Sequence, residues 1–316
     1  METKEEVTNN MHIKSLMLSL ITTFLLSFGS SSAVLANDLQ DGLDSFHKQD
    51  YKTAYNLFLP LAEKGVAGAQ YSLGVMYYKQ KGVPRDYKKA VKLFRLAAEQ
   101  GVALAQYNLG LMLSDGTGVT RDYKEAVKWY RLAANQGLAL AQSNLGVRYE
   151  TGQGVSKDYK EAAKWYRLAA DQEYAEAQVN LGAMFTEGRG VPKNLKEAIR
   201  LFRLSAVQGF AGGQTNLGVM FDIGQGVAQD FNEAAKWYQL AADQGDADAQ
   251  YNLGMLYAQG QGVSQNYVLA YMWWNIAGSN KIKDAVTNKN ILETEMTPSQ
   301  IGKAREMASQ WRPKRK

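Results

Sequence analysis

The sequence predicts an all-α solenoid of antiparallel helix pairs, built from units of 36 residues. A fixed period of about 20–50 residues is typical of solenoids, in which each unit buries its apolar face only against its neighbours. The chain has 316 residues, of which 46% are hydrophobic, enough for a packed core of this kind. The period is set by the dipeptide Leu-Gly, which recurs every 36 residues at Leu73-Gly74, Leu109-Gly110, Leu145-Gly146, Leu181-Gly182, Leu217-Gly218 and Leu253-Gly254.

The first 36 residues are typical of a secretory signal peptide. The apolar run from Leu16 to Phe28 is shorter than the ~20 residues that a membrane-spanning helix needs. Val34 and Ala36 place small residues at the two positions that determine cleavage, so we expect cleavage near Ala36. Three of the first six residues are glutamates, which do not suit the start of a signal peptide, so we expect Met11 to be the native start. The segment predicts a periplasmic or secreted protein.

Residues 37–66 resemble a degenerate copy of the later units. Asp50-Tyr51, Ala54 and Gly65 align with the second helix of those units. Because the outermost units of a solenoid cover its apolar ends, we expect this segment to act as the N-terminal cap of six regular units in 67–282.

The first helix of a unit is illustrated by residues 103–138. Ala105, Leu109 and Met112 fall at helical spacing and predict a helix of about 12 residues. Gly110 lies inside it, although an interior glycine costs about 1 kcal/mol relative to alanine. We therefore expect the partner helix to approach closely at this glycine. The sequence Asp115-Gly116-Thr117-Gly118-Val119 then ends the helix.

The second helix of the unit begins at Asp122, with Glu125 three residues later as in a capping box. It ends at Gly137, where a left-handed residue suits the C-cap. Glu173 stands where other units have this glycine, and a non-glycine residue there should cost about 1 kcal/mol or alter the joint. The capping pair recurs at Asp158/Glu161, Asn194/Glu197 and Asp230/Glu233, and we expect core aromatics at Trp129, Trp165, Trp237 and Trp273, each followed by a tyrosine or tryptophan.

These motifs resemble the SEL-like repeat family, a relative of the tetratricopeptide repeat. The resemblance rests on Ala-x-Ala-Gln-x-x-Leu-Gly, Gly-x-Gly-Val, Asp-Tyr, Lys-Glu-Ala and Trp-Tyr-x-x-Ala-Ala. It implies a right-handed α-solenoid whose first helices line a concave groove. It also implies an exported adaptor, assembly factor or regulator that binds a protein or peptide.

Residues 283–316 fall outside the period. Thr297-Pro298-Ser299-Gln300 predicts a helix start, because proline is well tolerated in the first turn. The apolar face of this helix predicts a C-terminal helical cap, followed by the basic tail Arg312–Lys316, which we expect to be solvated. The face consists of Ile301, Ala304, Met307, Ala308 and Trp311.

The groove implied by the resemblance carries a recurring asparagine, which we call the asparagine row: Asn108, Asn144, Asn180, Asn216 and Asn252. An asparagine amide both donates and accepts hydrogen bonds, so the row could bind the main chain of an extended peptide. Equally, each amide could bond a neighbouring helix and fix the geometry between units. Tyrosines favoured at binding surfaces stand beside the row at Tyr71, Tyr107 and Tyr251.

The net charge is +5, yet the groove is predicted to be acidic, with Glu150 and Asp222 in one column. A basic partner is therefore favoured. Arg148 interrupts a column of methionine and leucine, and we expect it to reach the groove rim or a carboxylate of a neighbouring unit. The second helices carry lysines and arginines interleaved with glutamates at i,i+3, for example Glu125/Lys128, which can pair. This pattern indicates a solvated face and disfavours nucleic acid.

The sequence favours a non-enzymatic interaction scaffold without a cofactor. It contains no cysteine, and only one of its two histidines, His47, follows the predicted signal peptide, so thiol catalysis and histidine-rich metal sites are excluded. The alternative is a cell-wall-associated enzyme or ligand-binding protein. Glu150 and Asp222 are its only candidate acid/base pair, and two units of separation exceed the roughly 5–10 Å that glycoside chemistry needs.

Overall fold

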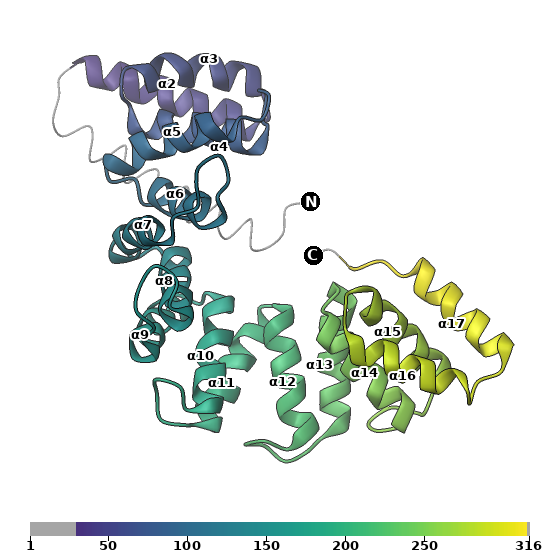
Figure 1. Cartoon of the computed structure of the whole chain (residues 1–316). Coiled ribbons are helices and arrows are strands. Elements are labelled where there is room, and N and C mark those ends of the chain that lie inside the picture. Colours follow the sequence, from purple (N-terminus) through teal and green to yellow (C-terminus); the bar gives the residue numbers. More distant parts are fainter. Residues whose placement is uncertain (1–29, 315–316) are drawn as a thin grey trace. The chain divides into compact units, whose positions relative to one another are not determined.

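This computed structural model describes residues 30–314, in which helices are joined by short turns and loops (Figure 1). The predicted apolar run at 16–28 and the expected start at Met11 lie outside these residues, and Ala36 lies within the first described helix. Sixteen helices follow one another in the described part, with no strand. They are α2 (Ser30–His47), α3 (Tyr51–Glu63), α4 (Ala67–Lys79), α5 (Tyr87–Glu99), α6 (Ala103–Asp115), α7 (Tyr123–Asn135), α8 (Ala139–Thr151), α9 (Tyr159–Ala170), α10 (Ala175–Glu187), α11 (Leu195–Val207), α12 (Ala211–Ile223), α13 (Phe231–Gln244), α14 (Ala247–Gln259), α15 (Tyr267–Ser279), α16 (Lys283–Glu293) and α17 (Pro298–Gln310).

The chain divides into two compact units, each of which contains several 36-residue repeats. The first unit ends at Asp158 and the second begins at Tyr159. The first contains α2–α8 and the second α9–α17. Inside each unit a helix packs mainly against the helices before and after it in the chain, with additional contacts such as α2 with α4 and α10 with α12. This neighbour-to-neighbour packing confirms the predicted all-α solenoid of helix pairs.

The recurring Leu-Gly is explained by close helix packing, as predicted. A Cβ atom on Gly110 of α6 would lie 2.7 Å from the Tyr130 ring of α7. In the second unit a Cβ on Gly218 would lie 2.7 Å from the Tyr238 ring. Both tyrosines are completely buried. The glycine therefore makes room for the aromatic residue on which each helix pair is packed. Of the predicted core tryptophans, Trp165 and Trp273 are buried, whereas Trp129 and Trp237 are only half-buried.

The second helices begin at the predicted caps, but only one of the two hydrogen bonds of the capping box is formed at Asp122. The Asp122 carboxylate accepts a hydrogen bond from the backbone N–H of Glu125 at 2.9 Å. The Glu125 carboxylate instead pairs with Arg95 of the preceding second helix at 2.6 Å, so the expected pairing with Lys128 is wrong for this glutamate. A charged partner binds a carboxylate more strongly than a neutral N–H does. The complete capping box lies at Thr297 of α17.

Glu173 adopts the left-handed backbone conformation that the sequence predicts for this position. Its φ of 63° is in the left-handed region, where glycine occupies the equivalent positions of most other repeats. Lys281 has the same role after α15, with a φ of 72°. At both positions a side chain is held in a conformation that favours glycine.

The C-terminal segment folds onto α15 with the predicted apolar face. Ala304 is fully buried and Ile301 packs beside it, while Met307, Ala308 and Trp311 join the core formed by α13, α14 and α15. The sequence did not predict α16. Its Glu293 accepts hydrogen bonds from Tyr271 and from Arg305, the latter at 2.9 Å, and so joins α15, α16 and α17. These bonds lower the pKa of Glu293, whereas burial raises the pKa of Tyr271.

Candidate functional site

The repeated polar residue that organises the packing is a glutamine one turn before Leu-Gly. Gln106 lies in the first turn of α6 and is only 4% exposed, and its amide donates to the backbone carbonyl of Ala98 at 3.1 Å. That carbonyl lies in the last turn of α5, where helix carbonyls have no partner within the helix. We call the equivalent positions the glutamine row: Gln70, Gln106, Gln142, Gln178, Gln214 and Gln250, all buried and all bonded to the second helix before them.

The glutamine row also accepts a hydrogen bond. The Gln214 oxygen receives the amide of Gln244, at the end of α13, at 2.7 Å. Gln214 thus joins the end of α11, the start of α12 and the end of α13. Gln136 bonds Gln106 in the same way at 2.8 Å. Sequence reasoning missed this role, although recurrence every 36 residues was the signal that could have found it.

The asparagine row lies two residues after the glutamine row on the same helices, and all five of its side chains are half-buried. Asn108 hydrogen-bonds the Tyr71 hydroxyl, which opposes the rise that burial causes in the pKa of that tyrosine. Asn144 and Asn216 donate to carbonyls of their own helices, Leu140 at 3.0 Å and Gly212 at 2.8 Å. Their amide oxygens remain available as acceptors.

Two members of the row, Asn180 and Asn252, make no side-chain hydrogen bond to the described residues. Both are half-exposed, so water or a partner can reach their amides. The row therefore divides into Asn108, which joins two repeats, and four members that do not. Peptide binding by the row stays a prediction. At Asn108 the alternative applies, because this amide bonds the Tyr71 hydroxyl of the neighbouring repeat.

The three tyrosines beside the row lie in different surroundings. Tyr71 is 7% exposed and its ring packs on Phe94, so it cannot contact a partner without moving. Burial raises its pKa to about 12. Tyr107 is half-buried with its ring 6.1 Å from Tyr130. The Tyr251 hydroxyl accepts a hydrogen bond from Asn288 of α16 at 3.4 Å.

Arg148 contacts the turn of its own repeat and a residue of the preceding repeat, and neither partner is the expected carboxylate. Its guanidinium donates to the Gln153 amide oxygen and lies over the Tyr123 ring, 5.4 Å from the ring centre. A cation over an aromatic face is stabilised by the ring electrons. Its Nε is buried without a hydrogen-bond partner in the described residues. Arg148 therefore joins α8 to α7 and to its own turn.

The acidic residues Glu150 and Asp222 belong to different units, each at the end of a first helix. The Asp222 carboxylate accepts a hydrogen bond from Tyr238 at 3.0 Å. Burial raises the pKa of Asp222, and the hydrogen bond from Tyr238 opposes that rise. Ser114 makes the equivalent bond to Tyr130 in the first unit, at 3.2 Å. Asp222 thus has a packing partner and remains half-exposed.

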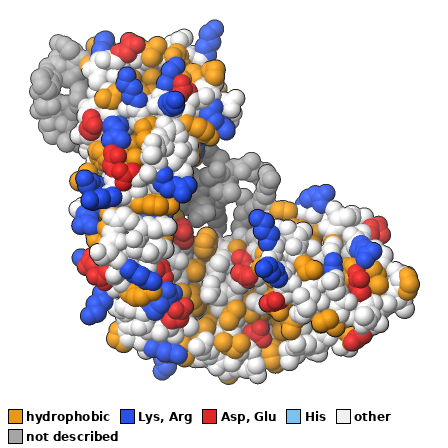
Figure 2. Space-filling view, in the orientation of Figure 1, with side chains coloured by type: hydrophobic (Ala, Val, Ile, Leu, Met, Phe, Trp, Pro, Cys, Tyr) orange, Lys and Arg blue, Asp and Glu red, His pale blue; other side chains and the backbone are white. Residues whose placement is uncertain are grey.

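The charged surface of the second helices consists of interleaved signs. Lys236 pairs with Glu233 at 2.6 Å, and Arg200 pairs with Glu197 at 2.7 Å. Figure 2 shows basic and acidic side chains interspersed on the visible face. No group of three or more metal-binding side chains is found in residues 30–314, and no described helix combines the length and apolar character needed to cross a membrane.

Comparison with known proteins assigns the repeats. The Sel1 repeat family model matches seven successive segments that cover 35–281, namely 35–66, 67–102, 103–138, 139–174, 175–210, 211–246 and 247–281. The chain belongs to the Sel1 repeat family. Each of the six segments from residue 67 onward contains one first helix and one second helix, and α16 and α17 follow the last segment.

Solved Sel1 repeat structures are similar to this chain. A Sel1 repeat protein from Oxalobacter formigenes is 34% identical, with a TM-score of 0.71 over 77% of this chain and 99% of that one. The c5321 protein, a protective antigen of uropathogenic Escherichia coli with an SLR fold, is 25% identical, with a TM-score of 0.43 over 93% of this chain and 94% of that one. No match was found among curated proteins.

The family as a whole has a general function. Sel1 repeat proteins generally mediate protein–protein interaction, and the family is typically non-enzymatic. Within the described residues, the five asparagines of the row and Asp222 are half-exposed polar side chains on the first helices.

Proposed function

We propose that this chain is an exported, non-enzymatic interaction scaffold that binds an extended protein segment along its first helices. The observation that carries the proposal is the contrast between the two recurring amides. Every glutamine of the row is buried and bonded to the second helix before it, whereas Asn180 and Asn252 recur at the same period without any described packing partner.

The proposed binding chemistry is main-chain recognition. An amide with a free donor pair and acceptor can bond the N–H and C=O of an extended peptide, largely independently of its sequence. In the second unit, three successive first helices, α10, α12 and α14, each carry one asparagine of the row. We place this binding on Asn180 and Asn252, whose amides can donate and accept, and on Asn216, whose amide oxygen accepts while its N–H donates to Gly212.

The proposed partner is basic. Asp222 and Asp248 lie on the same first helices as the row, and Glu176 and Glu187 lie on α10. Opposite charge near a binding surface steers association and selects partners more than it raises affinity. We expect the acidic residues to favour peptides with lysine or arginine beside the segment that the asparagines hold.

The test is selection of peptides from a displayed random library by the whole chain. We expect enrichment of sequences with net positive charge, and loss of that enrichment when Asn180, Asn216 and Asn252 are all changed to alanine. Enrichment of acidic sequences, or of none, would contradict the proposal.

Export is proposed from the N-terminal segment. Expression of the full chain in a bacterium with a periplasm should give a processed protein outside the cytoplasm, and N-terminal sequencing should find Asn37 first. Recovery of the unprocessed chain from the cytoplasm alone would exclude export by this segment.

A further inference from the structure

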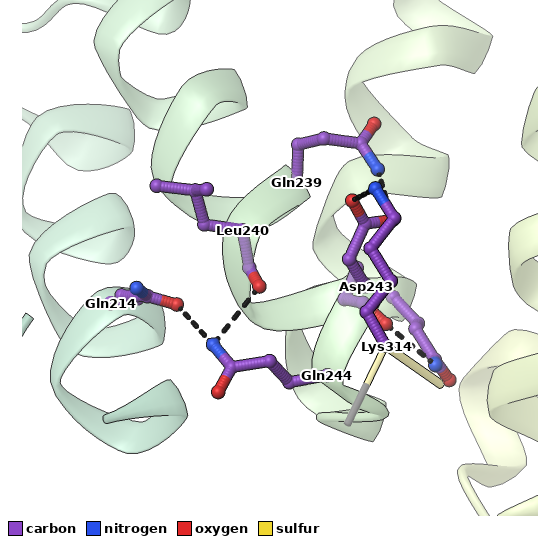
Figure 3. Close-up of polar contacts among 8 residues, drawn as sticks. Gln214, Gln239, Leu240, Asp243, Gln244 and Lys314 are labelled. Atoms are coloured by element: carbon purple, nitrogen blue, oxygen red, sulfur yellow. Dashed lines mark hydrogen bonds and ion pairs between the residues drawn. The ribbon is translucent and has the colours of Figure 1, made fainter. Parts of the chain in front are cut away.

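The residues after α17 are bound to α13, and their contacts are those of a docked peptide. The Lys314 backbone N–H donates to the Asp243 carbonyl at 2.7 Å, and its ammonium group pairs with the Asp243 carboxylate, also at 2.7 Å (Figure 3). Gln239, one turn earlier on α13, donates to the other carboxylate oxygen at 2.8 Å. Main-chain and side-chain bonds together hold this extended lysine.

Two apolar contacts precede the lysine. The Trp311 ring stacks edge-on against Trp273 of α15, with centroids 6.1 Å apart. Pro313 and Trp311 lie over Gly245, within 3.6 and 3.9 Å of where a Cβ atom would be. At Gly65, Gly101 and Gly137, the same position of other repeats, no atom lies within 4 Å of such a Cβ.

The repeat that binds the tail departs from the others in charge. Gln239 stands where four other repeats have Arg95, Arg131, Arg167 and Arg203. The acids Glu99 and Asp171, which are equivalent to Asp243, each have such an arginine four residues before them, where side chains of a helix are neighbours. Beside Asp243 a neutral amide takes the place of that arginine and orients the carboxylate. In the other two repeats the arginine is engaged elsewhere, since Arg95 pairs with Glu125 and Arg167 lies over the Phe185 ring.

We propose that α13, Gly245 and Trp273 form a peptide-docking site for a segment that carries an aromatic residue, one spacer, proline and lysine, and that the C-terminal Trp311–Lys314 is its resident ligand. A partner segment of the same chemistry must displace this tail. The site lies on second helices, apart from the asparagine row, so it goes beyond the scaffold function proposed above.

The experiment measures binding of a labelled peptide with the sequence of residues 306–316 to the full chain by fluorescence anisotropy. Lys314→Glu in the protein places a carboxylate against Asp243 and weakens the resident tail without altering the site. An intramolecular ligand competes at a high effective concentration, so we expect the Lys314→Glu protein to bind the peptide at least about fivefold more tightly than the natural chain.

The control variants locate the binding. In the Lys314→Glu protein, Gln239→Arg should restore the cation found in other repeats and abolish the gain, whereas Asp171→Asn, at the position equivalent to Asp243, should not alter it. Thermal unfolding of each protein checks that it is folded. Equal affinity of the natural and Lys314→Glu chains, no binding to either, or binding that is insensitive to Gln239→Arg would overturn the proposal.

Discussion

The glutamine row and the asparagine row recur with the same period on the same helices, yet their surroundings differ. On α12, Gln214 is 2% exposed and is bonded to α11 and α13, whereas Asn216 is half-exposed and donates only to its own helix. The two residues are two positions apart and so point to different sides of the helix. Recurrence alone therefore does not separate packing from binding in a repeat protein, but burial and hydrogen-bond partners do.

The largest effect expected from this comparison is on folding. Gln214→Ala removes two hydrogen bonds of a buried side chain, one to the Ala206 carbonyl and one from the Gln244 amide, and it creates a cavity. We expect a loss of about 2–4 kcal/mol in the free energy of unfolding. Asn216→Ala on the same helix should change it by less than about 0.5 kcal/mol. Urea denaturation measures both changes. Comparable losses in the two variants would show that the asparagine contributes to packing as much as the glutamine does.

The glycine of Leu-Gly, like the glutamine row, serves helix packing. Gly218→Ala places a methyl group against the Tyr238 ring, and overpacking of this kind costs about 1–3 kcal/mol. Gly302 of α17 has no atom within 4 Å of its would-be Cβ. Gly302→Ala should therefore stabilise by about 0.5–1 kcal/mol, the helix-propensity gain alone. Stabilisation by both substitutions would show that the helices do not approach as closely as described.

The sequence predicted the helix pairs, the Leu-Gly contact, the strained Glu173 and the apolar face of α17, because each depends on spacing or on backbone conformation within one or two helices. It could not predict the partner of the Glu125 carboxylate, which lies on a different second helix, or the tail contact between Lys314 and Asp243. It wrongly placed Tyr71 on a binding surface, because a recurring position in the sequence indicates the face of the helix but not how deeply the side chain is buried. The repeat motif contains the recurring glutamine, but a sequence pattern does not show which backbone carbonyl the glutamine amide will reach.

A smaller effect should come from Glu173, where a side chain occupies a left-handed position. Glu173→Gly removes this strain, and we expect a gain of about 0.5–1 kcal/mol. The matched reverse substitution is Gly101→Ala, which has a φ of 90° and open space around its would-be Cβ. It should cost about 1 kcal/mol through backbone strain alone. A loss of stability on Glu173→Gly would show that this side chain makes a stabilising contact.

The smallest expected effect depends on pH. The hydrogen bond from Arg95 holds the pKa of Glu125 below its ordinary value of 4.5, against the opposing influence of burial. The folded pKa is thus below the unfolded one, so the pair stabilises the fold above pH 4.5 and this contribution is lost as the pH falls through the folded pKa.

Glu125→Gln should remove that dependence. Because both partners are about one third exposed, solvent screening limits the loss to about 0.5 kcal/mol at neutral pH. Below the folded pKa, the variant and the natural chain should be equally stable. Unfolding curves at neutral and acidic pH measure the difference, and an unchanged difference across this range would exclude the ion pair as its cause.

We propose that the asparagine row binds a partner while the glutamine row packs the helices. The decisive measurement is the affinity of the best-enriched library peptide for the natural chain and for the protein with Asn180, Asn216 and Asn252 changed to alanine. From this proposal we expect at least about a tenfold loss of affinity with an unchanged unfolding midpoint. Unchanged affinity in the folded variant, or a fall in the unfolding midpoint that matches the loss of binding, would contradict it.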